Sequence, residues 1–256
     1  MFYAQTICSA ERDIFVDKQP DCRVFHGRFT LLAMIKASST TTRRMPIDPP
    51  LTTRLREATR TLHTEVERAG VMRFLLRGQL DRVGYCALLR NLHAVYAALE
   101  AGVRQYNQHA GLARLRCESM FRADSLADDL KLLHGPNWAT DIVLVSAAVS
   151  YAQHLNETTE PLMLAAHAYV RYLGDLSGGQ ILARIVANSL YLAPNQGVCF
   201  YDFGSTENVN RLAQEFRAGL DLLADEDSAH TVVDEARAAF ARHRNLFEQL
   251  APVLRS

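Results

Sequence analysis

Hydrophobic residues recur every three or four positions along most of the chain, which is the spacing of one buried face of an α-helix. The first run follows a Pro-Pro pair and a threonine-rich start, and it contains Leu51, Leu55, Ala58, Leu62 and Val66. The same period continues in Tyr85, Leu88, Leu92, Val95, Tyr96 and Leu99. Further helices are predicted over about 119–134, 141–156, 161–190, 206–224 and 230–250.

Turn-forming sequences separate these predicted helices, namely "HGPNW", "ETTEP" and "APNQG". Only "VCFYDF" has the composition of a strand, and no alternation of strands with helices is present. The pattern therefore predicts an all-α fold, a single-domain helical bundle over residues 47–256.

Residues 1–46 lack this periodicity. A short apolar run, "FTLLAMI", is followed by the polar and basic "KASSTTTRR", which indicates a disordered or loosely attached extension. Neither a secretory signal nor a mitochondrial presequence fits, the latter because it would avoid the acids Glu11, Asp13, Asp17 and Asp21. One hypothesis is that translation begins at Met45. N-terminal sequencing of native protein that begins near Phe2 would exclude that hypothesis.

Composition narrows the class of protein. The 256 residues are 48% hydrophobic with a formal net charge of zero, and a balanced charge argues against nucleic acid as the main partner. No apolar run approaches the roughly 20 residues of a membrane span, so no membrane anchor is expected. The five cysteines are odd in number and form no CxxC pair. This pattern indicates reduced thiols and a cytoplasmic location.

A glycine-rich segment, "RYLGDLSGGQILARI" over residues 171–185, interrupts an otherwise apolar helix. Each glycine in a helix interior costs about 1 kcal/mol relative to alanine. Gly174 and Gly178 lie one turn apart, so together they remove side chains from one face and let a flat group approach the backbone. A linker or a close helix crossing is the alternative.

Two familiar motifs are excluded in this segment. "LSGGQ" matches the signature loop of ABC transporter ATPases, but the chain has no GxxxxGK[ST]. Ser177 is not the nucleophile of a GxSxG elbow, because Asp175 stands where the first glycine would be. Asp175 itself is either an exposed ion-pair partner of Arg171 or a carboxylate that orders water above a ligand.

His63 has a favourable context for binding a metal. It borders the apolar stripe of the first helix, and Glu67, one turn later, can accept a hydrogen bond from one ring nitrogen. The other nitrogen would then be free to bind iron. Without a CxxCH motif, HExxH or a facial triad, non-covalently held haem is favoured over a bare metal ion. Other histidines lack such a neighbour and are interpreted as structural, namely His93, His134, His154 and His243.

Three blocks of the chain closely resemble haem oxygenases: "LREATRTLHTEVE" (55–67), "MRFLLRGQLDRVGYCALLRNLHAVYAALE" (72–100) and "AAHAYVRYLGDLSGGQIL" (165–182). The resemblance extends over about 51–250. It implies that haem b is both cofactor and substrate, and that its ring is opened at a meso carbon to biliverdin, ferrous iron and carbon monoxide. The reaction would use O2 and electrons from a separate reductase, because no GxGxxG is present for a nicotinamide or flavin.

The same resemblance assigns roles to residues. His63, supported by Glu67, would be the axial iron ligand, and the backbone at Gly174 and Gly178 would lie against the opposite haem face. Asp175 and Tyr96 would hold the water network that delivers protons. Four residues would bind the haem propionates: Arg56, Arg60, Tyr169 and Arg217.

Some propionate positions depart from the family pattern. Arg56 and Arg60 stand where relatives often carry lysine, and a lysine expected near Ala213 is missing. These differences bear on the ring orientation, and therefore on which meso carbon opens. The arginines around the haem edge would also form the docking face for the reductase.

Two rival interpretations remain open at this level. A non-catalytic haem carrier or sensor would need the same pocket without an ordered proton path. An interaction module would use the histidine and the glycines only for helix packing, and its spectrum would show no Soret shift on haem addition.

Overall fold

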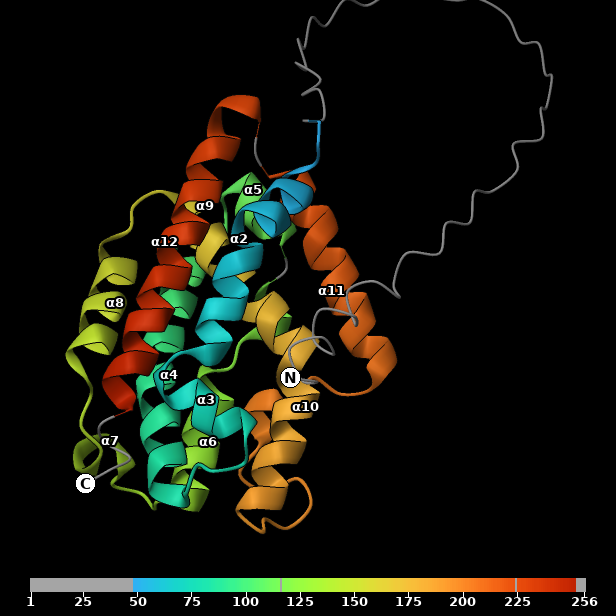
Figure 1. The fold of residues 1–256 in the computed structure, drawn as a ribbon. Coiled ribbons are helices and arrows are strands. Elements are labelled where there is room, and N and C mark those ends of the chain that lie inside the picture. The colour runs from blue at the N-terminus through green and yellow to red at the C-terminus, as the bar shows by residue number, and fades with distance from the viewer. Residues whose placement is uncertain (1–47, 116, 224, 252–256) are drawn as a thin grey trace, which may run out of the picture. The chain divides into compact units, whose positions relative to one another are not determined.

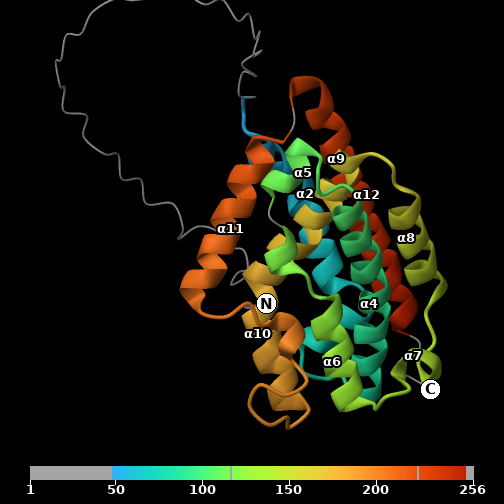
Figure 2. The same cartoon turned by 180° about the vertical axis from the view of Figure 1, so that it is seen from behind.

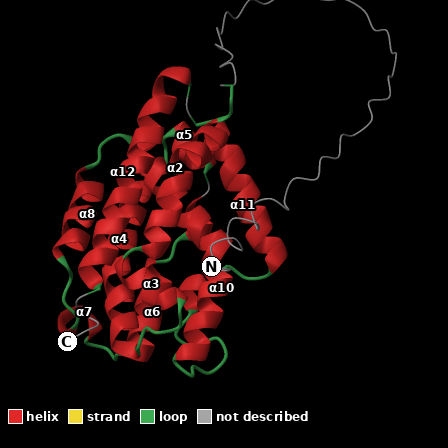
Figure 3. Ribbon diagram, viewed as in Figure 1, coloured by secondary structure: helices red, strands yellow, loops and turns green. Residues whose placement is uncertain are grey.

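The computed structural model describes residues 48–115, 117–223 and 225–251, which form a bundle of helices (Figure 1). No strand occurs in these described ranges (Figure 3), so the all-α prediction is confirmed. The predictions for residues 1–46 fall outside the described part of the chain. Within the described part, no helix has the length and apolar content needed to cross a membrane.

The elements follow one another in chain order. They are α2 (Leu51–Arg68), α3 (Gly70–Leu76), α4 (Arg82–Gln105), α5 (Ala110–Arg114), η1 (Cys117–Met120), α6 (Ala123–Leu133), α7 (Trp138–Asp141), α8 (Ser146–Glu157), α9 (Pro161–Ala168), η2 (Tyr169–Leu173), α10 (Gly174–Ser189), η3 (Cys199–Tyr201), α11 (Thr206–Asp221) and α12 (Glu226–Leu250).

Two long helices organise the bundle. α4 packs against α6, α8 and α9, while α12 lies along α2 and also contacts α9 (Figure 1 and Figure 2). The apolar periodicity of the sequence marks the buried faces correctly, since the residues predicted to be on these faces in α2 and α4 are buried or half-buried. The contacts of α2 with α12 fix the helix that carries His63.

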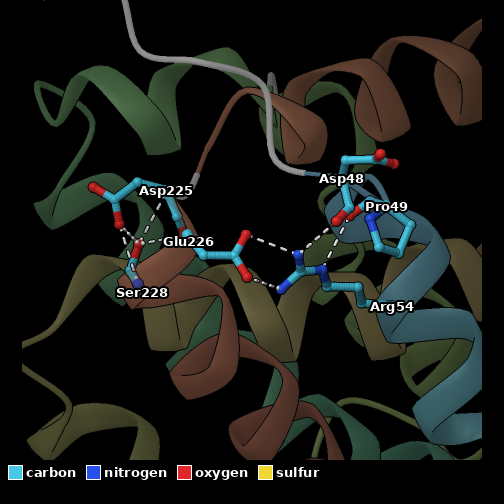
Figure 4. A network of polar contacts seen from close by, with 6 residues as sticks. All are labelled: Asp48, Pro49, Arg54, Asp225, Glu226 and Ser228. Carbon is cyan, nitrogen blue, oxygen red and sulfur yellow. Dashed lines mark hydrogen bonds and ion pairs between the residues drawn. The ribbon is translucent and has the colours of Figure 1, made fainter.

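Polar contacts fasten the start of α2 (Figure 4). The Arg54 guanidinium donates two hydrogen bonds of 2.8 Å to the two carboxylate oxygens of Glu226 on α12. The backbone N–H and hydroxyl of Thr52 both donate to Asp221 Oδ1, at 2.9 and 2.8 Å. Exposed ion pairs contribute at most about 1 kcal/mol each. Their effect here is to set the direction in which α2 enters the bundle.

Helix ends differ from the predictions where side chains form caps. α12 begins at Glu226 rather than near residue 230, because Asp225 and Ser228 form a capping box (Figure 4). The predicted helix over 119–134 is divided into η1 and α6. The strand-like "VCFYDF" contains the short 3-10 turn η3.

The predicted helix over 161–190 is continuous but not uniform. Its α-helical parts, α9 and α10, are joined by η2, one π-helical turn that ends directly before Gly174. Single π turns inside α-helices occur frequently at functional sites. Gly174 itself has ordinary α-helical backbone angles, φ −61° and ψ −46°. The irregularity of this helix therefore lies N-terminal to the glycines.

Candidate functional site

α10 has a bare face at the predicted glycines. Beyond the chain neighbours and the adjoining helix backbone, a Cβ atom added to Gly174 or Gly178 would meet no atom within 4 Å, although Gly178 is buried. At Gly179, in contrast, an added Cβ would lie 3.5 Å from the Tyr201 carbonyl oxygen. Neither Gly174 nor Gly178 is required by an unusual φ, so open space beside the backbone is what distinguishes these two positions. The bare face is present, and its predicted contact with haem stays a prediction.

His63 lies on α2 and is half-buried. Its ring packs against Phe240 of α12, with the ring centroids 4.8 Å apart. Glu67, one turn later, is also half-buried, and burial raises the pKa of its carboxyl group. A hydrogen bond from an imidazole N–H would offset part of that desolvation. The predicted hydrogen bond between these two side chains stays a prediction.

A hydrogen bond joins α2, which carries His63, to η2, which directly precedes the glycine face of α10. The hydroxyls of Thr59 and Tyr169 lie 3.3 Å apart, and Thr59 Oγ1 donates its proton to the Leu55 carbonyl at 2.8 Å. The Tyr169 hydroxyl must therefore be the donor to Thr59. Tyr169 is only 8% exposed. To donate a hydrogen bond to a propionate, the Tyr169 hydroxyl would have to turn its proton away from Thr59.

Asp175 lies in a buried network rather than on the surface. Arg171 Nη2 donates to Asp175 Oδ1 at 2.9 Å, and the Tyr96 hydroxyl donates to the other carboxylate oxygen. Arg171 Nε donates to the Tyr96 hydroxyl at 2.8 Å, which closes the triangle. The ion pair with Arg171 considered from the sequence exists, but it is buried: Asp175 is 6% and Arg171 13% exposed. The sequence indicated this partner for Asp175 but not the participation of Arg171 in a network with Tyr96.

The network holds opposing electrostatic effects. Burial raises the pKa of Asp175, while the positive charge of Arg171 and the hydrogen bond from Tyr96 oppose that rise. Burial also raises the pKa of Tyr96 well above its usual value, so Tyr96 keeps its proton and remains a donor. Removing one partner of a buried ion pair typically costs about 3–5 kcal/mol, because the other charge is left buried. The site therefore holds its carboxylate in one fixed position.

Besides Tyr169 on η2, the predicted propionate partners lie on two neighbouring helices, α2 and α11. Arg56 and Arg60 are exposed on α2, two turns and one turn before His63. Arg217 is half-buried on α11, which packs against α2. Ala213, where a lysine was expected, is buried on the same helix and adds no charge.

A second polar cluster joins α8, α9 and α12. His154 Nε2 and His167 Nε2 each lie 2.8 Å from Glu235 Oε1, and the ligand atoms of the three residues are within 4.8 Å of one another. Arg242 can only donate to His154 Nδ1, at 3.1 Å, so His154 Nε2 carries its proton toward Glu235. This pattern is that of a hydrogen-bonded network rather than a metal site. His154, interpreted from the sequence as structural, has a carboxylate partner that comes from a distant helix, Glu235 on α12.

Comparisons with known proteins agree with this geometry. The family model described as "Heme oxygenase" matches residues 49–249. "Heme oxygenase 1" of Nostoc sp. is 36% identical over 203 residues, which cover 78% of this chain and 85% of the relative. "Heme oxygenase 1" of Homo sapiens is 35% identical and covers 82% and 74%. The structure of heme oxygenase-2 from Synechocystis sp. in complex with heme and NO superimposes with a TM-score of 0.77 at 33% identity, covering 80% and 87%.

Proposed function

The chain belongs to the haem oxygenase family, and we propose that it binds haem b between His63 on α2 and the bare face of α10. As a haem oxygenase it degrades haem to biliverdin, iron and carbon monoxide. Bound haem supplies both the iron centre that activates O2 and the ring that is oxidised. The protein's own residues bind the ring, orient it and control the protons.

One observation carries this proposal most directly. Gly178 is shielded from solvent, yet beyond its two chain neighbours and the adjoining helix backbone no atom lies within 4 Å of an added Cβ. A buried face without side chains accepts a flat macrocycle that a packed helix would exclude. The half-buried imidazole of His63 would hold the haem iron, and Glu67, one turn away, would fix the tautomer of that imidazole.

Asp175 is proposed to control proton delivery. Its carboxylate is held by Arg171 and Tyr96, so it is positioned to order water beside the bare face rather than to contact iron. Tyr96 remains a hydrogen-bond donor because its pKa is raised by burial. A fixed carboxylate that accepts and a hydroxyl that donates would orient the hydrogen bonds of water molecules bound between them.

The edge of the ring would be held by positive charge. Arg56, Arg60 and Arg217 are proposed to bind the propionates, and the exposed pair on α2 also suits the docking of an electron-donating reductase. The described cysteines are free thiols, which supports the proposal of a cytoplasmic location.

Aerobic reduction of the haem complex tests the function. With ascorbate, or with a reductase, the Soret band should disappear while biliverdin and carbon monoxide form. The Arg60→Glu variant should weaken haem affinity, because a carboxylate would face a propionate. At saturating haem and low salt it should slow the reductase-driven reaction about tenfold more than the ascorbate-driven reaction. A Soret band that persists during reduction would indicate a carrier or sensor. Equal effects of Arg60→Glu on both reactions would argue against the docking face.

A larger side chain on the bare face of α10 should weaken haem binding. We expect Gly178→Val to weaken haem affinity by on the order of 10- to 100-fold, because its side chain would occupy the ring's position. The apo protein should keep its melting temperature, since no atom lies where the new Cβ would be placed and valine forms helix better than glycine. Haem titration followed at the Soret band measures the affinity, and circular dichroism melting of the apo protein measures the melting temperature.

Ser177→Val is the matched control, because its side chain projects about 100° away from Gly178 around the helix axis. It should bind haem like the unaltered chain. Equal affinities of Gly178→Val and the unaltered chain would exclude a ring against this face.

A further inference from the structure

Asp129 on α6 fastens a distant segment of the chain. Its side chain is 1% exposed, and its two carboxylate oxygens accept hydrogen bonds from the first two N–H groups of η3. Cys199 N lies 2.9 Å from Oδ1 and Phe200 N lies 2.8 Å from Oδ2. A buried carboxylate that receives two backbone donors is strongly oriented, so η3 is held to α6 in one register.

The other end of η3 is fastened to the start of α6. Arg122 Nη1 donates to the Asp202 carbonyl at 2.6 Å, and its guanidinium lies 4.2 Å from the centre of the Phe203 ring. The carboxylate of Glu100 on α4 in turn accepts a hydrogen bond from Ala123 N at 3.0 Å. η3 is therefore held on both sides by contacts that lead back to α4 and α6.

η3 in turn contacts α4 and α10, the helices that carry Tyr96 and Asp175. The Phe200 ring meets the Tyr96 ring edge-on, with centroids 5.4 Å apart and planes at 80°. The Tyr201 backbone lies so close to α10 that an added Cβ at Gly179 would be 3.5 Å from its carbonyl oxygen. A shift of η3 would consequently move Tyr96 on α4 and the Gly178–Gly179 backbone on α10.

We propose that Asp129 is a positioning residue for haem oxidation, which acts through η3 to hold the Tyr96 hydroxyl against Asp175. The proposal rests on the proposed role of Asp175 in proton delivery. A displacement of about 1 Å in a catalytic group can reduce a rate on the order of 100-fold. Loss of one Asp129 oxygen should thus reduce turnover without removing any group that contacts haem.

The test replaces Asp129 by asparagine, which keeps the shape but replaces one acceptor by an N–H donor facing a backbone N–H. We expect turnover to fall about 10- to 100-fold, with haem affinity within about twofold. In the haem-free protein, proton NMR should show a low-field hydroxyl signal for the Tyr96–Asp175 hydrogen bond, assigned by its absence in Tyr96→Phe. This signal should move or broaden in Asp129→Asn.

Two further variants make the result unambiguous. Asp128→Asn, an exposed neighbour on the same helix, should behave like the unaltered chain. Phe200→Leu leaves the Asp129 contacts in place but removes the ring edge against Tyr96, so it should reproduce the loss of turnover and the changed signal even if Asp129→Asn does not fold.

The inference is overturned if Asp129→Asn and Phe200→Leu only lower the melting temperature and leave the NMR signal and turnover unchanged. Asp175→Asn separates this result from failure of the proposed function. If Asp175→Asn is inactive while both other variants are normal, only the role of Asp129 is wrong. If Asp175→Asn is fully active, the proton-delivery role itself is wrong.

Discussion

Asp175→Asn is expected to bind haem with nearly unchanged affinity and to lose biliverdin formation by at least about 100-fold, the contribution typical of a positioned acid or base. The amide oxygen can still accept from Arg171 or Tyr96, so the side chain stays in place. The asparagine no longer carries the negative charge that we propose orders and orients proton-donating water. Biliverdin yield during aerobic reduction, set against haem affinity from a Soret titration, measures the two effects separately.

The same variant should be less stable, because Arg171 is left without its charge partner in a buried position. The loss is expected to be about 3 kcal/mol in the free energy of unfolding, measured by urea denaturation of the haem-free protein. Asp128→Asn serves as the control for removal of one carboxylate from the chain. Unchanged biliverdin output from Asp175→Asn would refute the proton-delivery role, and loss of haem binding would assign Asp175 to binding instead.

His63→Ala is expected to reduce haem affinity about 100-fold, equivalent to about 2.7 kcal/mol, and to change the position and shape of the Soret band. The alanine removes the proposed axial ligand, while the bare face of α10 still accepts the ring. Added imidazole should restore much of the spectrum, because it can enter the space beside Phe240 that the side chain leaves. Spectral titration with and without imidazole provides the measurement.

His134→Ala is the control, since His134 is exposed and its Nε2 lies 3.1 Å from Asp141 on the surface. This variant should bind haem with an unchanged spectrum. If His63→Ala also kept the unaltered spectrum and affinity, another residue would have to supply the axial ligand.

The periodicity of the sequence predicted the helices well, because a helical face repeats every three or four residues whatever its distant neighbours are. It could not predict their ends where capping intervenes, as at the start of α12, where Asp225 and Ser228 form a capping box. The segment of η3 has the residue types of a strand, but it forms a short 3-10 turn whose first two N–H groups donate to Asp129 on α6. Local sequence patterns therefore predicted the helices better than the contacts between segments that are distant in the chain.

In the candidate site, too, features within one helix were predicted, whereas contacts between helices were not. The spacing of Gly174 and Gly178 predicted the bare face, since both residues lie on one helix. The i, i+4 spacing of Arg171 and Asp175 predicted their ion pair but not its burial, which depends on Tyr96 from α4. Glu235 reaches His154 and His167 from far along the chain, and no spacing within one helix could indicate that contact.

The π turn of η2 determines where the glycines of α10 point. A π turn contains about one residue more than an α-helical turn. Each residue advances an α-helix by about 100°, so every position after η2 is rotated by about that angle from where an unbroken α-helix would place it. Insertion or deletion of a single residue within Tyr169–Leu173 would thus rotate the glycine face out of phase with α9. The proposed ring-binding slot therefore depends on the length of this turn as well as on the glycines.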